Sequence, residues 1–170
     1  MTVLPRLIAA VIVVFAFMAI EARRAARNER AQRALGGVEP PDDVYGWMQI
    51  AYPGAFLAMF AEGALRHGPS PLLTAGVALF AAGKALKWWA ILTLGRFWTF
   101  RVIVVPGATL VGAGPYRFLR HPNYVGVIGE LAGVGLLTGA AIAGPIGTAV
   151  FAGLIARRVS VEERALRRLP

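Results

Sequence analysis

The chain has 170 residues, of which 57% are hydrophobic and only 16% are charged, and its mean hydropathy is +0.60. A water-soluble domain of this length needs more polar surface, so the composition indicates an integral membrane protein. Because the sequence has no cysteine, disulfides, thiolate metal sites and a cysteine nucleophile are excluded. Its two histidines are far apart in sequence, and we therefore expect no metal site.

The first apolar run, from Val3 to Ile20, approaches the roughly 20 helical residues that cross a bilayer. It has no strong basic segment before it and no small-residue cleavage site after it, which favours a retained anchor over a signal peptide. The polar stretch from Glu21 to Asp43 is predicted to be a basic cytoplasmic loop.

Two further spans complete an N-terminal unit of residues 1–94. The first runs from about Val44 to Leu65, with a kink expected at Pro53, and the second ends near Leu94. Residues 95–170 are predicted to form the functional core, which opens with the longest non-apolar stretch of the second half, Gly95 to His121.

The last two spans, Pro122 to Gly139 and Ala141 to Ala156, are predicted to form a tight helical hairpin, and a short cytoplasmic tail helix follows from Arg157 to Leu169. The predicted fold is therefore all-α, an integral membrane bundle of about five transmembrane helices. Small residues at four-residue spacing indicate close helix packing, which we interpret as the seam of the hairpin, with a dimer face as the alternative. These pairs are Gly129 and Gly133, Gly135 and Gly139, and Ala149 and Gly153.

Positive charge is concentrated in three clusters, which hold fourteen of the eighteen basic residues. If all three face the cytoplasm, a chain with five spans has its N-terminus outside and its C-terminus inside. Basic clusters beside apolar spans indicate contact with anionic lipid headgroups, and we expect no nucleic acid partner. The clusters are Arg23, Arg24, Arg27, Arg30 and Arg33; Arg96, Arg101, Arg117 and Arg120; and Arg157, Arg158, Arg164, Arg167 and Arg168.

The segment GPYRFLRHPNYVG, residues 114–126, joins polar side chains to the start of the fourth span. Pro122 suits the first turn of a helix, so His121 falls at the N-cap, and the positive helix end there can attract an anion. Upstream glycines leave the backbone of residues 108–111 open to a planar ligand. The alternative is that the arginines and aromatic residues only anchor the chain at the membrane interface.

The tail segment RRVSVEERALRRL carries a second candidate group. Glu162 lies on the apolar helical stripe of Ile155, Val159, Leu166 and Leu169, and an inward carboxylate needs a partner. That partner is either Arg158, four residues earlier, or a cationic ligand. Glu163 is predicted to point elsewhere, where it pairs with Arg167 or completes a capping box with Ser160.

Three charged residues fall within the predicted spans, where charge is costly unless it is paired or functional. Lys84 and Glu130 are predicted either to pair across helices or to bind a substrate headgroup. Lys87 is predicted to extend its ammonium group to the inner interface.

Together, GPYRFLRHPNYVG and RVSVEERAL resemble the isoprenylcysteine carboxyl methyltransferase family over roughly Arg96 to Leu169. The resemblance implies a site for S-adenosylmethionine, with Glu162 as a further cofactor contact and Arg158 as the catalytic residue that faces the methyl acceptor. The other implied cofactor-binding residues are the backbone of Ala108, Thr109, Leu110 and Val111, and Tyr116, His121, Pro122, Asn123 and Tyr124.

The resemblance also implies methyl transfer to a carboxylate or hydroxyl oxygen of a small lipophilic acceptor that enters from the bilayer. The segment RFWTFRVIVVPGATLV is similar to bacterial members of the family, which favours an alkylresorcinol- or alkylpyrone-type lipid over a prenylcysteine and suggests a bacterial plasma membrane. An NADPH-dependent sterol-reductase-like enzyme, which also resembles the chain at RHPNYxG, is the alternative. A non-enzymatic membrane scaffold is a third interpretation.

Overall fold

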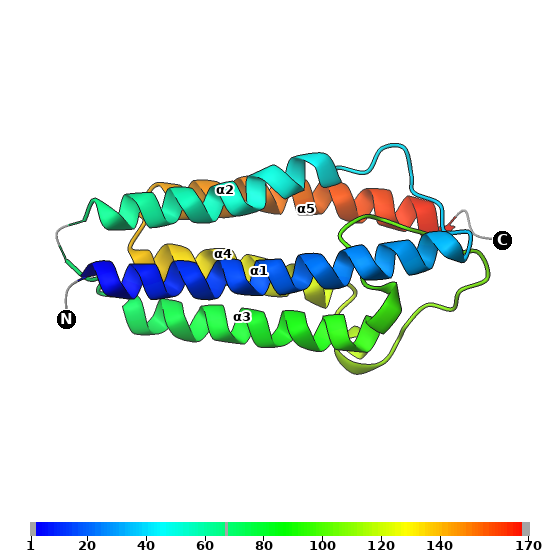
Figure 1. Ribbon diagram of the computed structural model, residues 1–170, viewed down its shortest axis with the longest axis horizontal. Coiled ribbons are helices and arrows are strands. Elements are labelled where there is room, and N and C mark those ends of the chain that lie inside the picture. Colours follow the sequence, from blue (N-terminus) through cyan, green and yellow to red (C-terminus); the bar gives the residue numbers. More distant parts are fainter. Residues whose placement is uncertain (1–2, 67, 168–170) are drawn as a thin grey trace.

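The computed structural model describes residues 3–66 and 68–167, and within these ranges the chain is all-α, as predicted, with five α-helices and no strands. The helices run alternately up and down in one elongated bundle, with the two ends of the chain at opposite ends (Figure 1). Two 3-10 turns, η1 (Gly95–Phe97) and η2 (Gly114–Arg117), lie between α3 and α4. The α-helices are α1 (Val3–Ala34), α2 (Tyr45–Ala64), α3 (Leu73–Leu94), α4 (Pro122–Thr138) and α5 (Ala143–Arg167).

Two helical segments in the described ranges, Leu4–Ala34 and Leu73–Phe97, are long and apolar enough to cross a membrane. The first carries large exposed apolar side chains at Leu4, Ile8 and Ile12. Such side chains suit contact with lipid tails rather than water. With 32 residues, α1 is about 48 Å long at the helical rise, which exceeds the apolar thickness of a bilayer.

The prediction of a loop from Glu21 to Asp43 was wrong for its first half, because α1 continues to Ala34. Two polar side chains of this half bind the segment after α3. Asn28 donates to the carbonyls of Gly95 and Trp98 at 2.9 and 2.8 Å, and Gln32 donates to the carbonyl of Arg96 at 3.0 Å. The polar composition of this half therefore reflects a helix face that binds the segment after α3, and not a loop.

The prediction of a separate tail helix was also wrong, because α5 runs without a break from Ala143 to Arg167. Ser160 lies inside this helix and donates to the carbonyl of Ala156 at 3.1 Å, so it does not begin a capping box. Arg168 and Leu169 lie outside the described residues. The start of the fourth span was predicted correctly, because α4 begins at Pro122 with His121 at its N-cap position.

The closest helix packing joins α3 and α4 rather than α4 and α5, so the predicted hairpin seam was largely misplaced. A Cβ atom added at Gly133 would lie 2.5 Å from the backbone nitrogen of Phe80, and one added at Gly126 would lie 2.8 Å from the carbonyl of Gly83. Among the described glycines of the predicted seam, Gly135 alone packs against α5, since a Cβ atom added there would lie 3.1 Å from the Cα of Gly144. Small residues let these backbones approach closely where lipid offers no hydrophobic gain.

Replacing Gly133 with alanine is expected to lower the melting temperature by several degrees, because overpacking a tight contact typically costs about 1–3 kcal/mol. Gly153→Ala is the matched control, since a Cβ there would have no described atom within 4 Å apart from its own stretch of helix. That variant should melt at or slightly above the wild-type temperature, since alanine favours helix. Thermal unfolding in detergent measures both, and equal melting temperatures for the two variants would contradict this packing.

The two loops at the C-terminal end of the bundle are clamped together. Val38 and Val104 form an antiparallel bridge with two N–H···O bonds of 2.9 Å, and Glu39 accepts from Arg101 Nη1 at 2.7 Å. Burial raises the pKa of Glu39, but hydrogen bonds from Arg101 and Arg33 outweigh it and hold the pKa below its usual value. Glu39 therefore stays charged, and the clamp covers the adjacent end of the bundle.

Candidate active site

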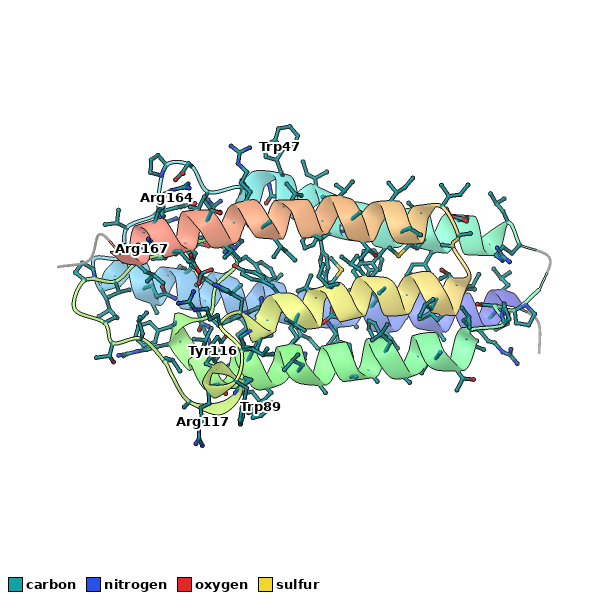
Figure 2. The ribbon with its side chains drawn as sticks, turned by 180° about the vertical axis from the view of Figure 1, so that it is seen from behind. Trp47, Trp89, Tyr116, Arg117, Arg164 and Arg167 are labelled. Carbon is teal, nitrogen blue, oxygen red and sulfur yellow. The ribbon has the colours of Figure 1, made fainter. Side chains whose placement is uncertain are left out.

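A cavity of about 690 Å³ opens beneath this clamp and extends down between the helices. Residues from all five α-helices and from the segment between α3 and α4 line it. Figure 2 shows Tyr116, Arg164 and Arg167 at this same end of the molecule, although they come from distant parts of the sequence. A cavity of this size accommodates a cofactor or a small lipid head.

One wall of the cavity is a chain of hydrogen bonds centred on Tyr124, in the first turn of α4. The Tyr124 hydroxyl donates to Glu162 Oε2 at 3.0 Å and accepts from Arg158 Nε at 2.8 Å. Arg158 and Glu162 are four residues apart on α5 and therefore project from the same face of the helix. Arg158 Nη1 also contacts Asp43 Oδ1 at 3.0 Å, and the exposed fractions of these two side chains are 6% and 3%.

His121 joins the same wall. Its ring stacks on that of Tyr124, with centroids 5.6 Å apart and planes 24° from parallel. It makes no side-chain cap hydrogen bond, and its Nε2 lies 3.7 Å from Glu163 Oε1. His121 and Glu162 therefore contact the same tyrosine, so the two motifs that lie about forty residues apart in the sequence meet in one place.

Tyr116 and Asn123 complete the part of the wall nearest the loops. Burial raises the pKa of Tyr116 above its usual value, and the negative charge of Glu162 adds to this shift, so the phenol remains protonated and can donate. Asn123 Oδ1 accepts from Trp98 Nε1 at 3.2 Å, which fixes its amide group. The aromatic rings and the Glu162 carboxylate make this wall suited to a cation.

Eight of the residues expected at the site line the cavity, and three do not. Pro122 is fully buried and starts α4, while Thr109 is exposed and Ala108 half-buried on the loop before η2. The eight that line the cavity are Leu110, Val111, Tyr116, His121, Asn123, Tyr124, Arg158 and Glu162.

Asp43 does not itself line the cavity, but it holds the cavity-wall residue Arg158, and the sequence did not reveal this role. The motif EPPDD reads only as a turn, and the link to Arg158 spans 115 residues. Two backbone N–H groups fix the carboxylate, those of Val102 at 2.8 Å and Tyr45 at 3.2 Å. In the described structure, the charge partner of Arg158 is thus Asp43, and Glu163 contacts Arg120 and His121.

A buried group of charges, here called the ionic cluster, lies below this wall and consists of Glu21, Lys84, Lys87 and Glu130. Lys84 lies 2.9 Å from both carboxylates, which confirms the predicted pairing with Glu130. Lys87 lies 2.6 Å from Glu21 and is itself buried, so the prediction that it reaches the interface was wrong. Glu21, on the inward face of α1, is the partner that a loop prediction could not supply.

Residues 76–168 match the model of the isoprenylcysteine carboxyl methyltransferase (ICMT) family. The chain belongs to this family. It is 31% identical over 149 residues to the "Uncharacterized protein YpbQ" of Bacillus subtilis, covering 87% of this chain and 89% of that protein. It is 26% identical over 146 residues to an uncharacterized protein of Haemophilus influenzae, with 84% of each chain covered. No solved structure gives a significant match.

Membership of the ICMT family indicates a membrane methyltransferase. The matched residues contain α4, most of α3, the loop with η2, and α5 through Arg167, and they therefore include the wall formed by Tyr124, Arg158 and Glu162. Asp43 and Glu21 lie before the matched region. The ICMT core thus receives charged partners from the N-terminal part of the chain.

Proposed function

We propose that this ICMT-family chain is an integral-membrane methyltransferase that uses S-adenosylmethionine and methylates a carboxylate or hydroxyl oxygen of a lipophilic acceptor. The observation that carries the proposal is the meeting of His121, Tyr124 and Glu162 on one wall of a large cavity. These residues belong to the two motifs that resemble the family, and they come together although the sequence separates them.

The residues present fit S-adenosylmethionine by their charge and shape. Its sulfonium and ammonium groups are cationic, and the wall offers the Glu162 carboxylate beside the ring faces of Tyr124 and His121. Glu162 is only half-buried and, among the described residues, accepts one hydrogen bond, from Tyr124, so it has capacity for a further donor. Exposed Arg120, at the cavity edge, suits the carboxylate of the cofactor.

Bound in this cavity, S-adenosylmethionine would supply the methyl group as an electrophilic carbon attached to sulfur. Glu162 and Tyr116 hold the cationic end, and Arg158 binds the acceptor oxygen and stabilises its anionic form. Asp43 and Tyr124 fix the plane of the Arg158 guanidinium through its Nη1 and Nε atoms, which leaves further N–H groups for the acceptor. Bringing two reactants into line in this way can contribute about 7–11 kcal/mol.

The proposed topology has five spans, with the N-terminus outside and the cavity at the cytoplasmic face of a bacterial plasma membrane. The described residues of all three basic clusters belong to segments at the end of the bundle where α1 and α5 end (Figure 1), which supports this orientation. The water-soluble cofactor then enters between the loops, and the acceptor enters from the bilayer. An alkylresorcinol- or alkylpyrone-type lipid remains the favoured acceptor, ahead of a prenylcysteine.

Binding of two cofactors to the detergent-solubilised chain tests the proposal. Isothermal titration is expected to show saturable binding of S-adenosylmethionine and none of NADPH. Incubation of membranes with methyl-labelled S-adenosylmethionine should then label a lipid-soluble product. Binding of NADPH alone would indicate a reductase, and binding of neither would favour a scaffold.

A further inference from the structure

The deep end of the cavity, formed by Glu21, Tyr52 and Lys87, has no role in the chemistry proposed above. It lies beside Glu130, which is six residues beyond Tyr124 on α4 and therefore about 9 Å deeper in the bundle. The ionic cluster thus borders the same cavity as the proposed cofactor wall, at a different depth.

Four buried charges are a costly way to hold helices together. Replacing a buried ion pair with well-packed apolar residues is often neutral or stabilising, and ionisable groups inside a membrane protein usually mark a functional site. The side chains of Glu21 and Glu130 are each 1% exposed, and that of Lys87 is 3% exposed. A binding role accounts for this arrangement better than packing does.

The hydrogen bonds at the deep end determine what it can bind. Lys87 Nζ donates to Glu21 Oε2 at 2.6 Å, to the Tyr52 hydroxyl at 3.4 Å and to Glu130 Oε2 at 3.5 Å, which uses all the donors of an ammonium group. Tyr52 in turn donates its hydroxyl hydrogen to Glu130 Oε2. The donors here are therefore occupied, so a ligand that only accepts hydrogen bonds finds no partner.

Oxygen atoms that can still accept a hydrogen bond, by contrast, remain at the deep end. Glu130 Oε1 is buried and has no hydrogen-bond partner among the described residues, which is costly for a carboxylate oxygen. The Tyr52 oxygen has a second lone pair, and Tyr52 lines the cavity. The Tyr52 ring is packed against Phe56 and Phe151, with centroids 4.9 Å away in each case, so the oxygen is held in place.

We propose that the deep end is a subsite for a second polar group of the methyl acceptor, a neutral hydrogen-bond donor such as a hydroxyl, which binds the Tyr52 oxygen. The ionic cluster orients Tyr52 by taking its hydrogen. The four charges of the cluster sum to zero, and the hydrogens of Lys87 and Tyr52 are already used, so an anionic group finds no free donor at this depth and the subsite selects a neutral donor. This inference rests on the proposed function and narrows its acceptor class to lipophilic molecules that carry a donor besides the methylated oxygen.

Two synthetic probes of equal alkyl chain length test the subsite: a long-chain alkylphenol, with one hydroxyl, and the corresponding alkylbenzene-1,3-diol, with two. Their binding is measured on the detergent-solubilised chain saturated with S-adenosylhomocysteine. Wild type is expected to bind the diol about five- to tenfold more tightly. Tyr52→Phe keeps the packed ring and should reduce this preference to less than about twofold.

Thr148→Val is the matched control, because the Thr148 hydroxyl is buried without a hydrogen-bond partner in the described part of the chain and does not line the cavity. This variant should keep the wild-type preference for the diol. Equal binding of the two probes by wild type, or a preference that survives Tyr52→Phe, would overturn the subsite. Failure of both probes to bind while S-adenosylmethionine still binds would also overturn it and leave the proposed function standing.

Discussion

Glu162→Gln is expected to weaken the binding of S-adenosylmethionine about ten- to hundredfold. The substitution keeps the size of the side chain and a carbonyl oxygen for the Tyr124 hydroxyl, but it removes the negative charge proposed to face the sulfonium and ammonium groups. A hydrogen bond to a charged group contributes about 1.5–3 kcal/mol, which corresponds to this range. Isothermal titration with S-adenosylmethionine measures the change.

Glu62→Gln is the control for this experiment. Glu62 lies at the far end of the bundle, where its carboxylate accepts from the backbone N–H groups of Ile142 and Ala143 at the start of α5. The Glu62→Gln variant makes the same chemical change away from the cavity and should leave cofactor affinity within about twofold of wild type. An unchanged affinity in Glu162→Gln as well would remove the cofactor role of Glu162.

Arg158→Lys is expected to reduce turnover by about a hundredfold while cofactor affinity stays within about threefold of wild type. Lysine retains the charge that pairs with Asp43, but it cannot reproduce the planar fork that contacts Asp43 and Tyr124 together. Misplacing a reacting group by about 1 Å can cost about a hundredfold in rate, and Arg158 is proposed to hold the acceptor oxygen in line with the methyl group. Steady-state kinetics with methyl-labelled S-adenosylmethionine and the lipid acceptor identified by labelling, together with titration of the cofactor, separate the two effects.

Lysine is a better choice than alanine at this position. Arg158→Ala would leave the Asp43 carboxylate, whose exposed fraction is 3%, without its charge partner, which typically costs about 3–5 kcal/mol. Arg157→Lys, the same change at the neighbouring exposed arginine, is the matched control and should keep full turnover. An Arg158→Lys variant with wild-type kcat would show that Arg158 does not hold the acceptor.

The parts of this structure that the sequence predicted are those with local signals. Pro122 marks the start of α4 because its ring suits a first helical turn, and Glu162 was assigned to an inward face because it lies on an apolar stripe. Both signals depend only on neighbours within one or two helical turns. The placement of His121 and Glu162 in one cavity required the resemblance to a family in addition.

The parts that the sequence did not predict depend on partners far along the chain. From sequence alone, Glu21 begins a polar stretch and Asp43 belongs to a turn motif. Their roles follow only from the structure, which places Lys84 and Lys87 beside Glu21 and Arg158 beside Asp43. The glycines of α4 showed that a close approach exists, but their spacing does not say which helix approaches. Only the tertiary structure shows that Gly133 of α4 packs against α3.

The contribution of α1 and α2 to the cavity has an evolutionary consequence. Tyr52 and Glu21 lie before the region that matches the ICMT family, whereas Tyr124 and Glu162 lie within it. Under the proposed roles, substitutions confined to the first two helices would alter which lipid is accepted without disturbing the methyl donor. Homologues could therefore diversify their chemistry by exchanging this half of the gene, and chimaeric proteins with grafted N-terminal helices offer a practical route to new acceptors.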